Sequence, residues 1–515
     1  MIFSIALGIL CVLGGLVALM LGKAIIWLLR SFKYMKQGIP TKYFPFIGYA
    51  KYLDNPQKDH GLEDFFQLFK DPKNPNKTQK ILQMNGFTAD PTIFVIDKEL
   101  VKEFFQKETQ VSYTTNAINF PAKEVLVFSN DAHGVQKQRA IFTEIFFPTN
   151  MEKHTPHIRA IVQRHLNRIK NVIKESGSEN QGSKQAEIEL KPYISDIFSD
   201  MVSFVLFGGE IPEVDGVMLV NQIDKVINGC YKNLTSFPHI ATLGLWTKLG
   251  LDPDYNQIMK LYRQIIKKLK EVVKERENSK THQFGSNFVD LLILKNRELE
   301  AQGKIDEIMS YDQIADTIFA LIFAGTDTTR NVTESSLYKL STDPQLQKDM
   351  REVVRKEVFD TGNGEQYKKY VESKMLKIFM KEALRVFMPA SMSFHRKITK
   401  TFTLGPYTIS KGDFLIVPFT ALHLKPEIFD KARTFDLAKY EEEKKIKEFS
   451  RSVLIPFSVG KRSCPGRNLA EIMFKIIFSN FVDQFELEKS SEPNRRFLEF
   501  SVGIKHCKAR LRCLK

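Results

Sequence analysis

The feature that most constrains this chain lies near its C-terminus, where residues 456–468 read PFSVGKRSCPGRN. One cysteine, Cys464, stands there among two glycines, a proline that follows it directly and three basic residues. A thiolate that binds a metal needs a backbone that turns tightly around the sulfur and donates amide hydrogen bonds to it, and glycine and proline allow such a turn. Basic neighbours favour the ionised sulfur. Taken alone, the segment fits either a metal-binding thiolate or a structural cysteine in a glycine-containing loop.

Composition sets the broad class of protein. The chain has 515 residues, of which 43% are hydrophobic, so it can bury a sizeable core. Its five cysteines include no CxxC pair, which argues against a disulfide framework and a zinc ribbon and favours a reducing compartment. The formal net charge of +15 suits nucleic acid, a membrane surface or an acidic protein, and it selects none of them.

The N-terminus predicts a membrane anchor. Residues 1–30 are almost free of charge and long enough to span a bilayer as a helix, with Trp27 where an interfacial residue is expected. Basic residues follow before any acidic one, which predicts that everything downstream faces the cytosol. A cleaved signal peptide is the alternative, but the apolar run is long for one. We therefore expect an anchor at 1–30, a proline-containing hinge at 31–50 and one large domain at 51–515.

Periodicity predicts a mainly α protein with a minor β-sheet. Two short runs at 80–85 and 92–97 have the composition of strands, and the chain beyond them places apolar residues at three- and four-residue spacing. Polar stretches at 175–185 and 275–286 are expected to be surface loops, because neither can bury enough apolar area to become ordered. The segment at 236–251 is unusually apolar, which indicates either core packing or a second membrane-contacting patch. Its apolar residues include Leu243, Leu245, Trp246 and Leu249.

Residues 310–340 have the length and pattern of one long buried helix. The middle of this helix holds Gly325 and three threonines around Asp327, which weaken a helix because hydroxyls compete for backbone carbonyls. Residues that lower helix stability in the middle of a helix indicate either a functional site or a local kink. Further on, Glu382 and Arg385 are three residues apart on one helical face, where they can pair.

Three motifs together resemble those of the cytochrome P-450 family, the haem-thiolate monooxygenases. FSVGKRSCPG fits the family's haem-binding loop, F-x-x-G-x-R-x-C-x-G, and AGTDTT at 324–329 resembles the oxygen-activating groove of its long I helix. EALR resembles the E-x-x-R pair of its K helix. The motifs occur in the family's order and at its usual separations, and the anchor and hinge are similar to those of the microsomal branch. The matched loop positions are Phe457, Gly460, Arg462, Cys464 and Gly466.

The resemblance implies the cytochrome P-450 fold with one N-terminal transmembrane helix, and haem b (iron protoporphyrin IX) as cofactor. Cys464 would be the proximal thiolate ligand, which donates electron density through the iron and favours O–O cleavage. Asp327 and Thr328 would form the acid–alcohol pair that relays protons to the reacting oxygen.

Further site residues follow from the same resemblance. Arg139 and Arg462 would pair with the haem propionates, with Arg396 as a third candidate for which the neighbouring His395 could substitute. The other loop residues Phe457, Gly460 and Gly466 would shape the cofactor site. The substrate pocket would be lined by Phe319, Ala320, Phe323 and Ala324, with Met392 and Phe500 as additional candidates.

Two positions depart from the family pattern. The family usually has a tryptophan four residues before the arginine that corresponds to Arg139, and this chain has Val135 there. The family also completes the network of Glu382 and Arg385 with a second arginine, where this chain has Lys439. Lysine keeps the charge but loses the planar fork that binds a carboxylate through two hydrogens. Lys439 is therefore expected to be a partial substitute in this network.

The implied reaction inserts one oxygen atom of O2 into an apolar substrate such as a fatty acid, a sterol or a xenobiotic. Electrons would come from an NADPH-dependent flavoprotein reductase, with a b-type cytochrome as a further candidate, because the chain has no glycine-rich dinucleotide motif. The expected location is the endoplasmic reticulum membrane, with lipid contacts and no nucleic acid partner. A basic cluster near the thiolate would attract an acidic reductase; it consists of Lys461, Arg462, Arg467, Lys475 and Lys137.

Two alternatives stay open. A hydroperoxide isomerase or dehydratase of the same fold would need no reductase, but such members often lack the acid–alcohol pair that is intact here. A membrane-anchored binding or scaffold protein that has lost catalysis is suggested by Val135 and Lys439.

Overall fold

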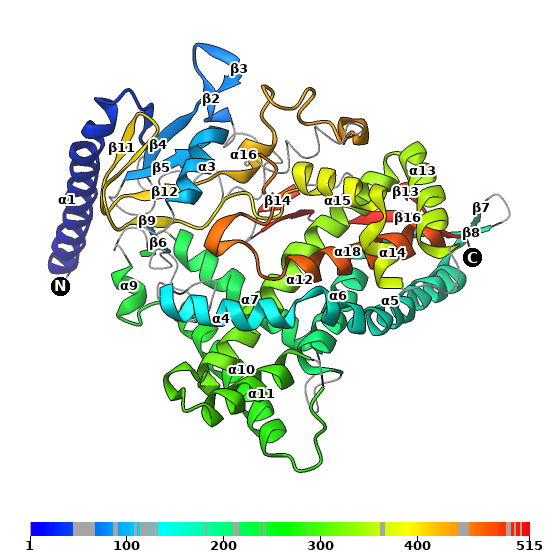
Figure 1. Ribbon diagram of the computed structural model, residues 1–515. Coiled ribbons are helices and arrows are strands. Elements are labelled where there is room, and N and C mark those ends of the chain that lie inside the picture. Colours follow the sequence, from blue (N-terminus) through cyan, green and yellow to red (C-terminus); the bar gives the residue numbers. More distant parts are fainter. Residues whose placement is uncertain are drawn as a thin grey trace.

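The described chain forms a large helical body with a smaller β-rich part at one side (Figure 1). This confirms the predicted class, mainly α with a minor sheet. The computed structural model describes residues 2–44, 67–85, 91–107, 111–113, 122, 129, 132–180, 183–209, 216–236, 238–239, 242, 244–285, 287–360, 366–440, 453–490, 496–498, 501–504 and 507–514.

The main sheet of the described chain has the strand order β1-β4-β5-β12-β9-β6. The two predicted strand runs correspond to β4, Ile81–Asn85, and β5, Pro91–Val95, which pair antiparallel and are buried throughout. In β4, Ile81 joins one apolar cluster and its neighbour Leu82 another, because successive strand residues point to opposite faces of a sheet. The remaining strands are β1 (Thr41–Lys42), β12 (Phe414–Ile416), β9 (Arg396–Ile398) and β6 (Val111–Tyr113).

A second sheet, β13-β16-β8-β7, corrects one prediction. The polar stretch at 175–185, expected to be a loop, contains the antiparallel β7–β8 hairpin. This hairpin is ordered because β8 pairs along its length with β16 and buries Ala186 and Ile188, a contact that the polar stretch itself does not reveal. The strands are β7 (Ser178–Asn180), β8 (Ser183–Glu189), β13 (Phe485–Lys489) and β16 (Lys508–Cys513). The described residues also form two-stranded hairpins, which join β2 (Lys70–Asp71) with β3 (Asn74–Thr78), β10 (Phe402–Leu404) with β11 (Tyr407–Ile409), and β14 (Arg496–Leu498) with β15 (Val502–Ile504).

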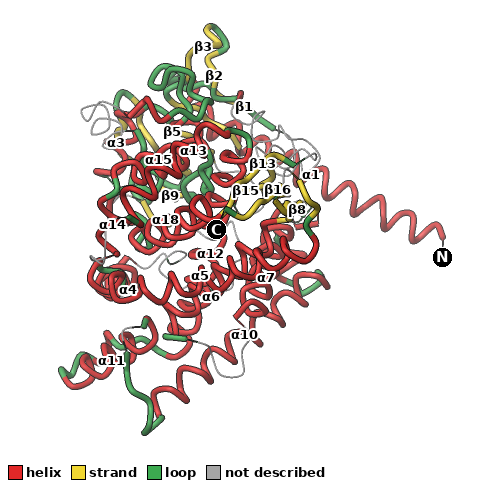
Figure 2. Tube along the Cα trace, turned by 90° about the vertical axis from the view of Figure 1, so that its right-hand side faces the viewer, coloured by secondary structure: helices red, strands yellow, loops and turns green. Residues whose placement is uncertain are grey.

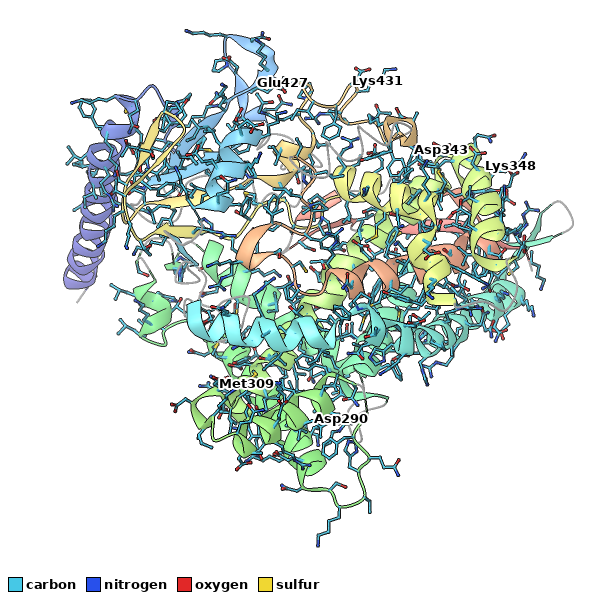
Figure 3. The ribbon with its side chains drawn as sticks, viewed as in Figure 1. Asp290, Met309, Asp343, Lys348, Glu427 and Lys431 are labelled. Atoms are coloured by element: carbon cyan, nitrogen blue, oxygen red, sulfur yellow. The ribbon has the colours of Figure 1, made fainter. Side chains whose placement is uncertain are left out.

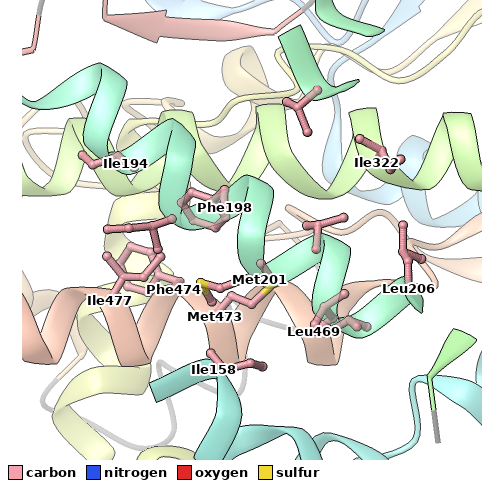
Figure 4. Close-up of a cluster of buried hydrophobic side chains, with 14 of the residues drawn as sticks. Ile158, Ile194, Phe198, Met201, Leu206, Ile322, Leu469, Met473, Phe474 and Ile477 are labelled. Carbon is pink, nitrogen blue, oxygen red and sulfur yellow. The ribbon is translucent and has the colours of Figure 1, made fainter. Parts of the chain in front are cut away.

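The helical body is assembled around α12, Tyr311–Ser341, which confirms the long buried helix predicted at 310–340. Ser310 begins this helix with a capping box, in which its hydroxyl accepts from the N–H of Gln313. Helix α12 packs against α6, α7, α10 and α18, and Figure 4 shows Ile322 of α12 in the same core as Phe198 of α6 and Met473 of α18.

The helices have the following bounds: α1 Ile2–Met35, α3 Lys98–Gln106, α4 Ala132–Ile145, α5 Pro148–Ser176, α6 Leu190–Phe207, α7 Gly216–Thr235, α9 Leu245–Lys248, α10 Pro253–Asn278, α11 Phe288–Ala301, α13 Pro344–Val354, α14 Gln366–Glu372, α15 Lys374–Val386, α16 Phe419–His423 and α18 Arg467–Gln484. Short helical turns are η3 Ile305–Glu307, η4 Arg355–Phe359, η5 Leu437–Tyr440 and η6 Gly460–Arg462. The end of α10 corrects a second loop prediction, because the stretch expected to be a loop from residue 275 is helical as far as Asn278.

Polar side chains close the loops at the edges of the body (Figure 3). The Asn296 side chain donates to the carbonyl of Met309 at 2.9 Å and accepts from its N–H at 3.1 Å, which fixes the connection between α11 and α12. Asp290 accepts from the N–H of Gly285 at 2.7 Å and so closes the loop before α11. The loops before α11 and before α12 are thus each closed by a side chain of α11.

Helix α1 projects from the body at its N-terminal end, as Figure 2 shows, and its last turns pack on the main sheet. The helix continues beyond residue 30 into the segment that the sequence assigned to a hinge. The guanidinium of Arg30 and the hydroxyl of Tyr34 each donate to the buried Asp413 at 2.6 Å. Trp27 is buried against the ring of Tyr43, with centroids 4.9 Å apart, and its interfacial position stays a prediction.

Nowhere in the described part of the chain does a helix carry an apolar stretch long enough to cross a membrane.

Candidate functional site

The loop around Cys464 turns back on itself immediately before α18. The Cys464 N–H donates to the Phe457 carbonyl at 2.8 Å. Two residues have left-handed backbone conformations, Ser458 with φ 58° and Gly460 with φ 79°, and glycine adopts this conformation without strain. Gly466 caps α18, so the sulfur lies next to the N-terminus of a helix, where the backbone dipoles favour negative charge.

The Cys464 side chain is accessible, although the loop and its neighbours surround it. Burial raises the pKa of its thiol, while the N–H of Gly466 and the guanidinium groups of Arg139 and Arg467 act in the opposite direction. A bound metal cation would shift the balance to the thiolate, because a coordinating thiol is deprotonated outright. The loop therefore presents a sulfur that is oriented for a ligand.

Arg139 and Arg462, both predicted site residues, lie beside this loop. Arg139 of α4 donates to the Ser463 carbonyl at 2.6 Å and to the Ser463 hydroxyl at 3.1 Å. Arg462 donates to the Ser129 carbonyl at 3.3 Å. Val135, one turn before Arg139 on α4, is buried in the main core, so this position contributes apolar packing in place of an aromatic ring.

Arg396, the third predicted propionate partner, is buried at the start of β9. Its guanidinium lies over the rings of Phe104 and Phe105, at 5.6 and 5.5 Å from their centroids. His395 stands edge-on to the ring of Phe414, and burial lowers its pKa to about 4. At neutral pH His395 is therefore uncharged, so it can replace an arginine only as a hydrogen-bond donor and not as a cation.

The threonines in the middle of α12 do not break the helix. Thr328 donates its hydroxyl to the Ala324 carbonyl at 2.8 Å, and Thr326 donates to the Ile322 carbonyl at 2.7 Å. Both hydroxyls thus bond to the carbonyl four residues earlier, and α12 stays helical through this segment.

Asp327 is buried and held by residues that the sequence did not predict. Its Oδ1 accepts from Arg330 at 2.7 Å and from Asn331 at 3.4 Å, and its Oδ2 accepts from the Ser501 hydroxyl at 2.5 Å. Arg330 also contacts Asp224 of α7 at 3.3 Å. The spacing of three and four residues from Asp327 could have indicated Arg330 and Asn331. Ser501 is 174 residues away and gave no such signal.

The predicted pocket residues of α12 separate into two groups. Ala320, Ala324 and Thr328 follow one another at four-residue spacing and share one helical face. Phe319 is fully buried and stands edge-on to Tyr262 of α10, with ring centroids 5.3 Å apart. Phe319 therefore contributes to the α10–α12 interface, and its place in the substrate pocket stays a prediction. Phe323 is buried in the core, Met392 is half-buried against the cluster around Leu82, and Phe500 lies outside the described residues.

Comparison with known proteins decides the family. The sequence profile described as Cytochrome P450 matches residues 40–511. This chain belongs to the cytochrome P450 family. This P450 is 25% identical to the geranylhydroquinone 3''-hydroxylase CYP76B74 of Arnebia euchroma, covering 81% of this chain and 83% of that protein. It is 23% identical to the probable cytochrome P450 6a18 of Drosophila melanogaster, covering 90% of each.

The fold agrees with this membership. The crystal structure of the cytochrome P450DA heme domain superposes with a TM-score of 0.72 at 17% identity, covering 93% of this chain and 98% of that one. The protein is therefore an oxidoreductase of the haem-thiolate monooxygenase family, with haem b as its cofactor. The donor set around Cys464 fits such a group, because it offers an accessible sulfur with guanidinium groups beside it.

The buried network of this P450 is centred on Glu382 and Arg385 of α15. Arg385 donates to both carboxylate oxygens of Glu382 at 2.7 Å. Lys439 lies 3.8 Å from Glu382 and instead donates to the Thr434 carbonyl at 2.9 Å. The hydroxyl of Tyr440, which the sequence reasoning missed, donates directly to Glu382 at 3.0 Å. Lys439 is thus a member of the network without a direct hydrogen bond to the carboxylate.

The predicted basic cluster of this P450 is smaller at the surface than its sequence suggested. Lys475 is only 2% exposed, and burial lowers its pKa to about 8, so it does not present a surface charge. Lys461 and Arg467 are exposed, and Arg467 pairs with Glu471 at 2.7 Å. The side chain of Lys137 lies outside the described residues.

Proposed function

We propose that this P450 inserts one oxygen atom of O2 into an apolar small molecule, with electrons from an NADPH-dependent flavoprotein reductase. The observation that supports this most is the combination of an accessible Cys464 with an intact Asp327–Thr328 pair on α12, the helix that packs against α18. The alanine face of α12 would leave room for an apolar substrate, and a fatty acid, a sterol and a xenobiotic all fit this description.

The cofactor would be held by the loop and its neighbours. When bound, the haem supplies an iron that activates dioxygen, and Cys464 would hold that iron as the thiolate. Arg139 and Arg462 would pair with the propionates, because a guanidinium fits a carboxylate through two parallel hydrogen bonds. Phe457, which packs against the main core, would support the loop beneath the sulfur.

Thr328 and Asp327 would move the protons that the reaction consumes. The Thr328 hydroxyl donates to a backbone carbonyl, so its oxygen keeps lone pairs that can accept a hydrogen bond from water. Asp327 is fixed by Arg330, Asn331 and Ser501, and it would pass protons through water to Thr328.

Thr328→Ala should separate electron use from product formation. We expect the variant to keep its haem spectrum and its substrate affinity, because the hydroxyl acts after binding. Product formed per NADPH should fall by about tenfold or more, with hydrogen peroxide released instead. Thr333→Ala is the matched control, since Thr333 makes the same type of bond to the Thr329 carbonyl in α12. An unchanged ratio of product to NADPH in Thr328→Ala would exclude the proposed role.

The hydroperoxide isomerase is the second candidate of the same fold, and the requirement for a reductase separates the two. We expect turnover of apolar substrates only with NADPH and a flavoprotein reductase, with a b-type cytochrome tested as an additional donor. Conversion of lipid hydroperoxides without any reductase would instead favour the isomerase. A protein that binds haem and substrate but turns over neither class would be the binding protein that has lost catalysis.

We further propose that residues 1–30 anchor the protein in the endoplasmic reticulum membrane with the domain in the cytosol. Exposed apolar residues on and after α9 would make a second lipid contact, and Figure 1 places α9 on the same side of the molecule as α1. They are Leu245, Trp246, Leu249 and Leu251. Burying such side chains in lipid is favourable in proportion to their apolar area.

Protease added to sealed microsomes should digest the domain and leave only an N-terminal fragment with the membrane. Full protection of the domain would show that the orientation is the opposite. The double variant Trp246→Ala and Leu249→Ala should stay anchored but become easier to extract with mild detergent. Leu294→Ala, which changes an exposed leucine of α11, is the control for loss of apolar surface elsewhere.

A further inference from the structure

The carboxylate of Glu382 collects more hydrogen bonds than its pairing with Arg385 requires. The N–H of Asp436 donates to Oε1 at 2.9 Å, and the hydroxyl of Tyr440 donates to Oε2 at 3.0 Å. Glu382, Arg385 and Tyr440 are all fully buried. Burial and the neighbouring carboxylate raise the pKa of Tyr440, so its hydroxyl keeps the proton that it donates.

Lys439 cannot supply this last bond in its present position. Its ammonium lies 3.8 Å from Glu382 and 3.8 Å from Asp436, and its hydrogen bond goes to the Thr434 carbonyl. Lys439 thus makes no direct hydrogen bond to Glu382 and lies nearest to Oε1, whereas the next residue in the chain, Tyr440, donates to Oε2. A guanidinium at position 439 would be longer and planar, and it could reach both oxygens through its two N–H groups.

We propose that Tyr440 is a positioning residue that supplies the donor which Lys439 does not, so that the two residues act as a coupled pair. The hydroxyl fixes Glu382, and Glu382 in turn fixes Arg385. Arg385 donates to the carbonyls of His423 at 3.3 Å and Thr434 at 2.9 Å, and also to the Ala432 carbonyl.

The same network reaches the thiolate loop through His423. The backbone N–H of Ile455 donates to Nε2 of His423 at 3.1 Å, and Ile455 lies two residues before Phe457, whose carbonyl accepts from the Cys464 N–H. Burial and the adjacent guanidinium of Arg385 lower the pKa of His423 to about 3, so the ring stays neutral and can accept this bond. Loss of the Tyr440 hydroxyl should therefore loosen the loop that holds the sulfur as well as the fold.

A double-mutant cycle tests the coupling, with Tyr440→Phe, Lys439→Arg and the double variant in the full chain. Two quantities are measured for each: the midpoint of unfolding, and the share of reduced, carbon monoxide-bound haem that shows the red-shifted band of thiolate ligation. We expect Tyr440→Phe to shift the unfolding equilibrium by about tenfold and to lower the thiolate-ligated share. Lys439→Arg alone should leave both unchanged or raise them slightly.

In the Lys439→Arg background, Tyr440→Phe should lower the unfolding midpoint and the thiolate-ligated share much less. The reason is that a guanidinium at position 439 can donate to Glu382 in place of the Tyr440 hydroxyl. Tyr34→Phe is the matched control. Its buried hydroxyl also donates to a carboxylate, Asp413, but this carboxylate bonds residues of α1 and not Arg385. This variant should therefore lose stability without losing thiolate ligation, and Lys439→Arg should not rescue it.

The proposal would be overturned if Tyr440→Phe lowered stability and thiolate ligation equally in the two backgrounds, or lowered them in neither. The assignment of Cys464 is tested separately, by the red-shifted band of the unaltered protein. If Tyr440→Phe alone cannot be recovered with haem, recovery of the double variant supports the coupling, and failure of both contradicts it.

Discussion

Cys464→Ala should lose the red-shifted carbon monoxide band completely. An alanine offers no ligand atom, and no other cysteine in the described chain stands in a glycine-containing loop at the start of a helix. The thiolate is also the group that favours O–O cleavage, so monooxygenase activity should fall to background even where some haem stays bound. The measurement is the difference spectrum of the dithionite-reduced protein with and without carbon monoxide.

Cys513→Ala is the matched control for this variant, because Cys513 is a free, half-buried cysteine in β16. It should keep both the band and the activity. A red-shifted band that survives in Cys464→Ala would show that the sulfur ligand has been assigned to the wrong residue.

Arg385→Met should strongly destabilise the fold, although it leaves Cys464 and the proposed propionate partners Arg139 and Arg462 in place. The Glu382–Arg385 pair is fully buried, and removal of one partner leaves a charge without its counter-ion in the core. Breaking a buried pair in this way costs about 3–5 kcal/mol, whereas an exposed pair contributes about 0.2–1 kcal/mol. The expected result is a large fall in the denaturant midpoint together with poor haem incorporation.

Lys295→Met is the control for this second variant, since Lys295 pairs with Glu298 at 2.8 Å on the surface, with side chains 31% and 51% exposed. It should shift the midpoint only slightly. Similar midpoints for the two variants would mean that the buried pair is solvated or replaceable, and the network around Glu382 would then carry little of the stability.

Local sequence patterns were sufficient to predict a structural feature wherever the residues that form it lie within a few positions of one another. The turn around Cys464 uses the left-handed conformation of Gly460, and the strand at β4 depends on a short apolar run. The long helix α12 follows from apolar spacing and a capping serine, and the pairing of Glu382 with Arg385 follows from a spacing of three. Each of these features is fixed by short-range geometry, which the sequence records directly.

Contacts between distant segments were decided only by the tertiary structure. The contact of Phe319 with Tyr262 of α10 is one of them, because helical spacing alone does not say which neighbour covers a face. Lys475 was predicted to be a surface charge, but the packing of α18 buries it.

The hydrogen-bond donors that complete the networks of Asp327 and Glu382 could likewise not be predicted from local sequence patterns. Ser501 reaches Asp327 across 174 residues, and Tyr440 reaches Glu382 across 58. The sequence by itself therefore determined the turn around Cys464, the long helix and the paired charges. The tertiary structure decided which side chains satisfy the buried carboxylates, because a buried acceptor bonds whichever donor the fold brings within about 3 Å.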